Sequence, residues 1–358
     1  MRVGCIGYAN RSGLGSYITN FRQHLPLNSQ MVIRHPDKGW LKIDVPYTLA
    51  DIHPTQEQLE DYLNMCSPDV VIIIETPFND DYFKILHDRN IGVIYIPMID
   101  CRSIQEIEPY IEYIDVVINN TQYGHNIYKE VFKEKAHYIP YPVDTDYFHP
   151  DKLEACDYSF LHNQGTGGSG YRKATDQVFI AFRQLHYQCP DATLRVNSQP
   201  YEHIHSQLFK DVKGATVKVQ DALDTIDIYK GSQTYVAPSR REGLGLPVLE
   251  AMSCGLAVIT TDAPPMNEWS PGNTLLVPVQ EEQNLPYGDI PMYTPNPFEL
   301  MQKMIYAYEH PKHMARIGQQ NRKIIEEKFS WKVLKDQYID ILEKVKKWHE
   351  IKRIANSL

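Results

Sequence analysis

The sequence has few cysteines, and their pattern indicates neither a metal site nor a disulfide framework. The six cysteines of the 358-residue chain are scattered, and no two form a Cys-x-x-Cys pair. Several lie in or beside apolar runs, which favours free buried thiols in a reducing compartment. No cluster of His, Cys and Asp has metal-ligand spacing either. The composition therefore predicts neither a zinc module nor a secreted domain held together by disulfides.

Long apolar runs and an excess of positive charge are also missing. Residues 70–74, one of the longest apolar runs, fall far below the roughly 20 residues of a membrane-spanning helix. Residues 1–7 are too short an apolar run for a signal peptide. The formal net charge is −9, so no general attraction to nucleic acid or to anionic membranes is expected. We therefore expect a cytoplasmic protein.

Two glycine-rich segments differ from the known phosphate-binding motifs. Residues 12–15, Ser-Gly-Leu-Gly, lack the G-x-G-x-x-G spacing of dinucleotide-binding loops. Residues 165–173, Gly-Thr-Gly-Gly-Ser-Gly-Tyr-Arg-Lys, fail the Walker pattern, because no glycine directly precedes the lysine and no Ser or Thr follows it. Taken alone, the first segment is compatible with a structural turn and the second with a surface loop.

What the sequence does contain is an alternation of expected strands and helices in both halves. Parallel strands covered on both faces are continuously apolar. Such runs occur in the first half at 2–7, 70–74, 92–96 and 115–119, with helical stretches such as 54–65 and 104–113 between them. The second half has runs at 158–161, 192–196, 215–219, 234–237 and 257–260. This alternation predicts an α/β protein with doubly wound sheets.

The alternation is interrupted near residues 142–156 by prolines and a cluster of aspartates. A chain of this length has room for two domains of ordinary size. We therefore expect a first domain at 1–149 and a second at 150–331.

The most informative segment is residues 241–250, in which two glutamates lie eight positions apart across a glycine-containing loop. Residues 234–237 before it and 257–260 after it are the expected strands. Pro247 suits the first turn of a helix and Gly255 the residue just past its end. The result is a βαβ unit, and the ligand site of such a unit lies at the carboxyl ends of its strands.

This loop offers the groups that a nucleotide-sugar requires. Gly243 and Gly245 allow close approach of the backbone, and the free amides before the proline can point at an anion. Glu250, expected near the start of the helix, reaches back over the loop to accept hydrogen bonds from a sugar diol. Glu242 can accept from a second sugar. The structural alternative is a glutamate favoured by the helix dipole, with glycines that only turn the chain.

The same segment resembles the E-x7-E motif of the retaining glycosyltransferases of the GT-B fold known as glycosyltransferase family 4. The resemblance continues through 255–261 and Glu268, and includes 139–150 and 329–331. It covers nearly the whole chain and is dense from residue 139 onwards. It implies two Rossmann-like doubly wound domains facing a central cleft. It also implies that a C-terminal helix, 332–350 here, crosses back to the first domain.

By this resemblance the chain is a glycosyltransferase that uses a nucleoside-diphosphate sugar, retains the anomeric configuration and needs no metal. In the family the second glutamate binds the ribose and the first contacts the transferred sugar, which gives Glu250 and Glu242 these roles. Lys173 matches a lysine that neutralises the diphosphate. The usual place of an accompanying arginine, near Asn163, carries no positive charge. Three nearby arginines are candidate substitutes: Arg172, Arg240 and Arg241.

The resemblance also makes the loop at residues 12–15 a candidate, because the family's equivalent loop borders the donor phosphates and sugar. The predicted catalytic residues are Glu242 and Lys173. The predicted donor-binding residues are Gly13, Leu14, Gly15, Arg172, Lys173, Glu242, Gly243, Leu244, Gly245, Leu246 and Glu250. We expect no metal and no cofactor besides the donor. Asp144-Thr145-Asp146 has the D-x-D letters of metal-using transferases, but its place between the domains favours a turn-forming linker.

The residues leave several alternatives open. Many family members place a histidine beside the transferred sugar, and Asp100 and His125 are the candidates here. The basic C-terminal residues are either a solvated helix end or a weak membrane contact: Lys344, Lys346, Lys347, Lys352 and Arg353. The residues favour no particular base or sugar for the donor.

The acceptor is open as well. A glycan, a lipid-linked sugar or a small metabolite is favoured over a hydroxymethylated DNA base, because the acidic balance disfavours DNA binding. The alternatives to transfer are a sugar-nucleotide epimerase, a synthase that forms a disaccharide phosphate, and a non-catalytic nucleotide-sugar-binding protein.

Overall fold

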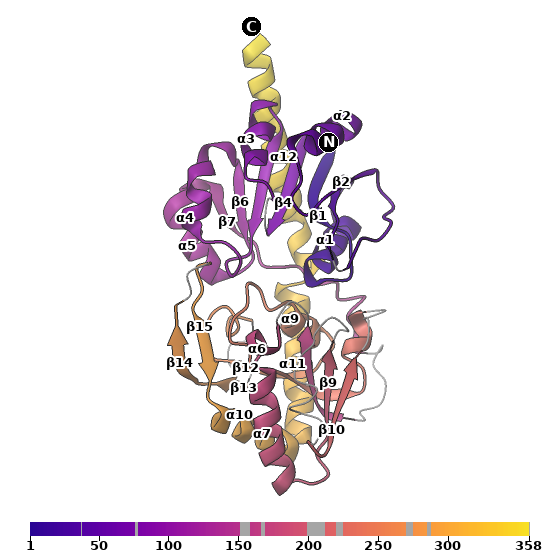
Figure 1. Cartoon of the computed structure of the whole chain (residues 1–358), viewed down its shortest axis with the longest axis vertical. Helices are drawn as coiled ribbons and strands as arrows, with labels where there is room; N and C mark the ends of the chain where they lie inside the picture. Colours follow the sequence, from indigo (N-terminus) through magenta and orange to yellow (C-terminus); the bar gives the residue numbers. More distant parts are fainter. Residues whose placement is uncertain are drawn as a thin grey trace. The chain divides into compact units, whose positions relative to one another are not determined.

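In a computed structural model the chain forms two compact α/β units (Figure 1). The structure describes residues 1–36, 38–75, 78–150, 158–165, 169–198, 212–219, 225–269, 275–284 and 288–357. The first unit comprises Met1–Pro142, Tyr287–Asp289 and Trp331–Leu358. The second comprises Val143–Pro286 and Ile290–Ser330.

The first unit is built on a parallel sheet in the order β3-β2-β1-β4-β5-β6-β7. Its strands are β1 (Val3–Tyr8), β2 (Leu27–Ile33), β3 (Tyr47–Ala50), β4 (Val70–Glu75), β5 (Gly92–Pro97), β6 (Val116–Asn119) and β7 (Ala136–Tyr138). Its helices are α1 (Gly13–His24), α2 (Gln56–Cys66), α3 (Asp81–Asp88), α4 (Ile104–Ile107), η1 (Glu108–Tyr113), α5 (Gln122–Phe132), η2 (Lys133–Lys135) and α12 (Trp331–Ser357).

The second unit has a parallel sheet in the order β10-β9-β8-β11-β12-β13 and a separate antiparallel pair, β14-β15. The strands are β8 (Tyr158–Gly165), β9 (Leu194–Ser198), β10 (Ala215–Val219), β11 (Ser232–Ala237), β12 (Ala257–Thr261), β13 (Leu275–Val277), β14 (Val279–Gln283) and β15 (Met292–Pro295). The helices are α6 (Ser169–Arg172), α7 (Thr175–Gln188), η4 (Thr225–Ile228), α9 (Leu246–Ser253), α10 (Pro297–Glu309) and α11 (Pro311–Lys328).

The expected alternation of strands and helices is confirmed in both units. The apolar runs at 70–74 and 92–96 are the central strands β4 and β5, and their side chains are almost fully buried. In the second unit β11 and β12 are equally buried, and helices α7 and α10 pack over a core that includes Phe160, Phe182 and Met304. Burial on both faces explains why these strands are continuously apolar rather than alternating.

Helix α12 belongs to the first unit although it ends the chain. It packs against β4 and β5, and a Cβ atom on Gly92 would lie 2.4 Å from a methyl carbon of Val345, so only glycine allows this approach. The buried His349 ring lies 2.8 Å from a carboxylate oxygen of Asp115 on one side and 2.8 Å from Asn90 Oδ1 on the other. Apolar contact and polar bonds together fix the helix on this unit.

Three expectations differ from the structure in detail. The helix expected over 104–113 is α4 followed by the 3-10 helix η1, because Pro109 interrupts the α-helical bonding. The closing helix expected over 332–350 runs from Trp331 to Ser357. Six strands lie outside the expected runs: β2 and β14 contain several polar residues, and β3, β7, β13 and β15 are only three or four residues long.

The described cysteines are unpaired, but only Cys5 and Cys254 are buried as expected, whereas Cys66 and Cys189 are partly buried and Cys101 is exposed. Cys5, Cys66, Cys101, Cys189 and Cys254 are free thiols. Cys156 lies outside the described residues. Over the part of the chain that the structure describes, no helix has both the length and the apolar character needed to cross a bilayer.

Candidate functional site

The loop that joins β11 to α9 has the local geometry that the sequence predicts. Gly245 adopts a left-handed conformation, with φ of 77°, directly before the helix, and Pro247 lies in the first turn. Gly255, with φ of 76°, follows the C-cap residue Cys254. One detail is corrected: α9 begins at Leu246, so Glu250 lies in its second turn and not at its start. The proline and the two glycines thus define the short helix.

Glu250 is buried in the second unit and is bonded to a tyrosine that the sequence did not single out. The Tyr229 hydroxyl donates to a Glu250 carboxylate oxygen at 2.5 Å, and both side chains are buried. Burial raises the pKa of the Glu250 carboxyl to about 7, although the Tyr229 bond and the charge of Lys173 oppose the shift. Near neutral pH this carboxyl is therefore close to its titration midpoint.

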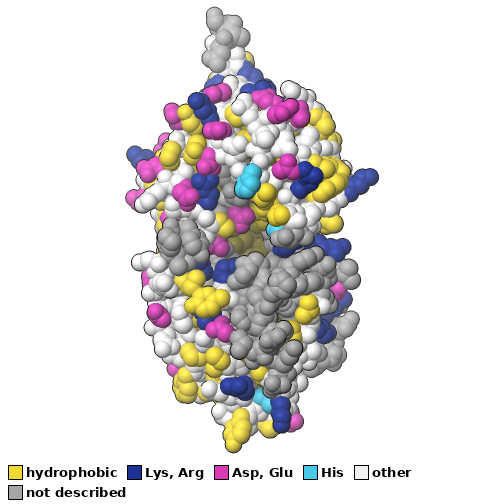
Figure 2. Space-filling view, viewed as in Figure 1, with side chains coloured by type: hydrophobic (Ala, Val, Ile, Leu, Met, Phe, Trp, Pro, Cys, Tyr) yellow, Lys and Arg dark blue, Asp and Glu magenta, His cyan; other side chains and the backbone are white. Residues whose placement is uncertain are grey.

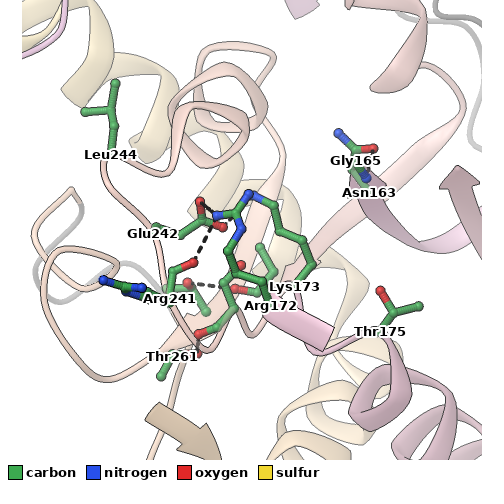
Figure 3. Close-up of polar contacts among 12 residues, drawn as sticks. Asn163, Gly165, Arg172, Lys173, Thr175, Arg241, Glu242, Leu244 and Thr261 are labelled. Carbon is green, nitrogen blue, oxygen red and sulfur yellow. Dashed lines mark hydrogen bonds and ion pairs between the residues drawn. The ribbon is translucent and has the colours of Figure 1, made fainter. Parts of the chain in front are cut away.

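The Glu242 carboxylate is paired with two cationic side chains, Lys173 and Arg172 (Figure 3). Lys173 Nζ donates to one carboxylate oxygen at 2.5 Å, and Arg172 Nη1 donates to the other at 2.8 Å. The side chains of Glu242 and Lys173 are 8% and 11% exposed, so this pair is screened little by solvent. Burial alone would raise the pKa of Glu242, but the charges of Lys173 and Arg172 outweigh it and hold the pKa at about 2. Glu242 is thus a fixed anion inside a cationic cluster.

The two cations are presented by the connection between α6 and α7. Arg172 ends α6, Lys173 follows it, and Ala174 takes a left-handed conformation with φ of 55° before α7 begins at Thr175. That conformation is costly for a residue with a Cβ atom, so the surrounding bonds must hold it. Of the glycine-rich run before α6, residues 166–168 lie outside the described residues.

The position near Asn163, where the family carries an arginine, has no positive charge here. The structure distinguishes among the three arginines proposed as its substitutes. Arg240 is bonded to both carboxylate oxygens of Asp176 at 2.7 Å and lies over the Tyr171 ring at 4.1 Å. Arg241 is buried, and its carbonyl oxygen accepts from Arg172 Nη1 at 3.0 Å. Arg172 is the arginine that shares Glu242 with Lys173. Asn163, at the end of β8, accepts a bond from the Gly165 amide at 3.3 Å.

The loop between Glu242 and α9 is held by a buried tryptophan. Trp269 Nε1 donates to the Leu244 carbonyl oxygen at 3.1 Å, and a Cβ atom on Gly245 would lie 3.5 Å from the same nitrogen. Sequence reasoning missed Trp269 and Tyr229. The sequence contains a signal for Trp269, because this residue directly follows Glu268, which matches the family pattern.

The remaining candidate residues belong to the first unit. Gly13 opens α1, and the Gly15 amide donates to the Ser12 hydroxyl at 3.1 Å. A Cβ atom on Gly15 would lie 2.1 Å from the Asn10 carbonyl oxygen, so packing alone requires this glycine. Around Gly13 there is open space. Leu14, between them, is partly buried.

Asp100 and His125 occupy different structural elements of the first unit. Asp100 follows β5, and the neighbouring Cys101 thiol lies 3.6 Å from its carboxylate. His125 lies on α5 and lines an open surface pocket of about 660 Å³ together with His137 and Tyr138. Burial, with the charge of Lys129, lowers the pKa of His125.

Two further segments that the sequence singled out are the D-x-D segment and the basic end of α12. The Asp144 carboxylate accepts from the backbone amides of Asp146 and Tyr147 at 3.1 and 2.9 Å, which confirms the D-x-D segment as a turn. At the end of α12, Lys352 lies over the ring of the half-exposed Trp348 at 4.4 Å. Within the described ranges, no group of three or more His, Cys, Asp or Glu side chains is arranged to hold a metal ion.

Comparison with known proteins places this geometry in context. Residues 165–286 match a family model described as glycosyl transferases group 1, so the match contains the cluster around Glu242. Among curated proteins, a probable sucrose-phosphate synthase of Thermosipho melanesiensis is 23% identical over 251 residues, which is 65% of this chain. The chain spans 55% of that relative's length, so about half of it.

Solved structures share the whole fold. Sucrose-phosphate synthase from Thermosynechococcus elongatus superposes with a TM-score of 0.74 at 14% identity, over 96% of this chain and 99% of that one. HepE of Anabaena, solved in complex with UDP and glucose, gives a TM-score of 0.70 at 12% identity, over 96% and 100%. The two doubly wound units and the C-terminal helix are therefore those of the GT-B fold.

Proposed function

We propose that the chain is a glycosyltransferase that moves a sugar from a nucleoside-diphosphate donor with retention of configuration and without a metal ion. The observation that carries this proposal is the buried cluster of Lys173, Arg172 and Glu242, with Glu250 on the adjoining helix. The match to the glycosyl transferases group 1 model over the same residues supports it. So does the shared fold with HepE, whose structure contains UDP and glucose.

Each residue of the cluster has a role that its surroundings suit. Lys173 and Arg172 would bind the diphosphate, whose negative charge grows as the sugar leaves. Glu242 would exchange its cationic partners for sugar hydroxyls when the donor arrives. Glu250, held by Tyr229, would accept the ribose hydroxyls. Backbone amides of residues 243–246, before Pro247, would complete the phosphate site.

A front-face reaction fits this set of groups. Lys173, Arg172 and the helix N-terminus would stabilise the departing phosphate, while that phosphate takes the proton of the attacking hydroxyl. Glu242 is paired with cations and would hold the sugar rather than attack its anomeric carbon. No covalent glycosyl-enzyme is formed on this route.

The first prediction concerns Glu250 and pH. Because binding of a diol needs the ionised carboxyl, nucleotide affinity should rise between pH 6 and pH 8 as Glu250 loses its proton near pH 7. Glu250→Gln should remove this pH dependence and weaken binding by about 1.5–3 kcal/mol at pH 8. Isothermal titration with UDP, GDP and ADP at both pH values measures this.

Glu250→Gln should weaken nucleotide binding at pH 8 but stabilise the folded protein at the same pH. The folded-state pKa of about 7 lies above the ordinary value of 4.5, so the folded protein binds a proton more tightly than the unfolded chain. The free energy of unfolding therefore falls as the pH rises from about 4.5 through the folded-state pKa of about 7. Glu250→Gln should raise the Tm at pH 8 and change it little at pH 4. A lower Tm at pH 8 with unchanged nucleotide affinity would assign Glu250 to the fold alone.

The second prediction concerns metal. If Lys173 and Arg172 supply the positive field at the diphosphate, transfer should keep nearly its full rate in EDTA. A nucleotide-release assay with and without chelator tests this. Loss of activity in EDTA that magnesium or manganese restores would show that a metal has the role proposed for these side chains.

The third prediction is stereochemical and tests the proposed reaction. An α-linked nucleotide donor should give an α-linked product, and proton NMR of the anomeric signal identifies the linkage. A β-linked product from an α-linked donor would contradict front-face transfer.

The acceptor belongs to the same proposal. A sugar phosphate is the first candidate to test, since sucrose-phosphate synthases are similar to the chain both in sequence and in fold. Glycans, lipid-linked sugars and other small metabolites follow. Hydroxymethylated DNA remains the minority choice. On the face seen in Figure 2, Lys and Arg side chains of the first unit are interspersed with Asp and Glu and do not form a basic patch.

A further inference from the structure

His162 is a buried residue for which the proposed reaction has no direct use, yet it connects the two segments that carry the cluster. It lies on β8 with 1% of its surface exposed. Its Nδ1 atom is 2.8 Å from the Val236 carbonyl oxygen, and its Nε2 atom is 2.9 Å from the Thr175 hydroxyl oxygen. Both ring nitrogens therefore have a partner inside the protein.

These two bonds define the state of the ring. A carbonyl oxygen only accepts, so Nδ1 carries the proton and donates to Val236. Nε2 is then bare and accepts from Thr175. Burial lowers the pKa of His162 to about 4, so the ring is neutral at physiological pH.

The partners of His162 belong to the segments that carry Glu242 and Lys173. Val236 lies in β11, the strand that leads into the loop with Glu242. Thr175 opens α7, separated from Lys173 only by the left-handed Ala174. One imidazole thus ties both segments to β8.

Arg240 makes a second set of bonds to the segment that carries Lys173, residues 171–176. The Arg240 side chain donates to the Tyr171 carbonyl oxygen at 2.6 Å and pairs with Asp176. The Arg240 amide donates to the Arg172 carbonyl oxygen at 2.8 Å. Although burial opposes it, Arg240 lowers the pKa of Asp176, which keeps this carboxylate ionised. Residues 171–176 are therefore bonded to β11 and its loop on both sides of Lys173.

We propose that His162 and Thr175 are positioning residues of the donor site, which fix Lys173 beside Glu242 before a diphosphate binds. This inference rests on the proposed function, because it assigns the fixed lysine to the diphosphate. A fixed lysine avoids the entropic cost of ordering its long side chain during binding. The bonds from His162 and Arg240 also offset the strain at Ala174.

The matched pair Thr175→Val and Thr175→Ser tests the proposal. Valine keeps the shape but removes the hydroxyl, which leaves Nε2 of His162 without its donor, whereas serine keeps the bond. Inorganic pyrophosphate is the probe, since its binding requires neither the correct base nor an acceptor. Its Kd is measured by isothermal titration well below the Tm of each variant, together with kcat and KM for the donor.

We expect Thr175→Ser to behave as the wild type and Thr175→Val to weaken pyrophosphate binding roughly 5- to 30-fold, with a matching rise in donor KM. If the valine variant does not fold, Thr175→Ala, which leaves room for a water, takes its place with the same expected direction. A lower Tm with equal pyrophosphate affinity in the valine and serine variants would overturn the positioning role alone. Absence of pyrophosphate binding to the wild type would overturn it together with the proposed function.

Discussion

Glu242→Gln should bind pyrophosphate more tightly than the wild type and yet transfer sugar at least about 100-fold more slowly. In the free protein the Glu242 carboxylate already occupies Lys173 and Arg172, so an incoming diphosphate must displace it. Glutamine keeps the shape but not the charge, which leaves both cations available to the phosphate. The transferred sugar, however, loses its anionic partner. Titration with pyrophosphate and steady-state kinetics measure the two effects separately.

Removal of the carboxylate should also cost stability, because two cations then lie near one another without their anion. Breaking a buried ion pair from one side costs about 3–5 kcal/mol. Added pyrophosphate should therefore raise the Tm of Glu242→Gln more than it raises that of the wild type. Glu282→Gln, an exposed residue of β14, is the matched control and should change neither quantity. Weaker pyrophosphate binding by Glu242→Gln would show that Glu242 supports the anion site instead of occupying it.

Lys173→Met should lower kcat for transfer by about 10²–10⁴-fold, with a smaller change in the Kd of the free nucleotide diphosphate. The lysine charge is worth most when the leaving phosphate gains charge in a site screened from water. Methionine retains the apolar stem at similar volume, so the loss reports the charge. Rate constants from nucleotide release, at donor concentrations above KM, measure it.

Lys323→Met is the matched control, because that lysine is 72% exposed and pairs with Glu327 only at 3.7 Å. It should leave rate and affinity within twofold of the wild type. A Lys173→Met variant that is folded and retains more than half of the wild-type kcat would remove Lys173 from the mechanism. Arg172 would then be the principal cation.

Periodicity predicted most of the fold because the strands that carry the core are apolar throughout. Residues 70–74 and 257–260 correspond to strands to within one residue at either end. Apolar periodicity does not predict strand β2, because its first residues, Leu27 to Gln30, are mostly polar. It is a strand because β1 and β3 pair with it on either side, a tertiary fact that the local sequence does not contain.

For the site, residue type and spacing predicted the members of the cluster but not their partners. The Glu242 and Glu250 positions follow from the loop and helix pattern. The contacts of Arg172 and Lys173 with Glu242 join residues 70 and 69 positions apart, and the left-handed conformation of the adjoining Ala174 is one that no propensity predicts. The bonds from Tyr229 to Glu250 and from Trp269 to Leu244 join residues about 20 or more positions apart, so they also require the fold.

The most direct test of the account is release of nucleotide from a panel of UDP, GDP and ADP sugars, with sugar-phosphate, glycan and lipid-linked acceptors. The account predicts that the wild type releases nucleotide diphosphate from at least one donor and that an acceptor accelerates release. It also predicts that Lys173→Met and Glu242→Gln lose this release while Lys323→Met keeps it. Equal release by wild type and Lys173→Met, or a wild type that binds none of the nucleotides and releases none, would contradict it.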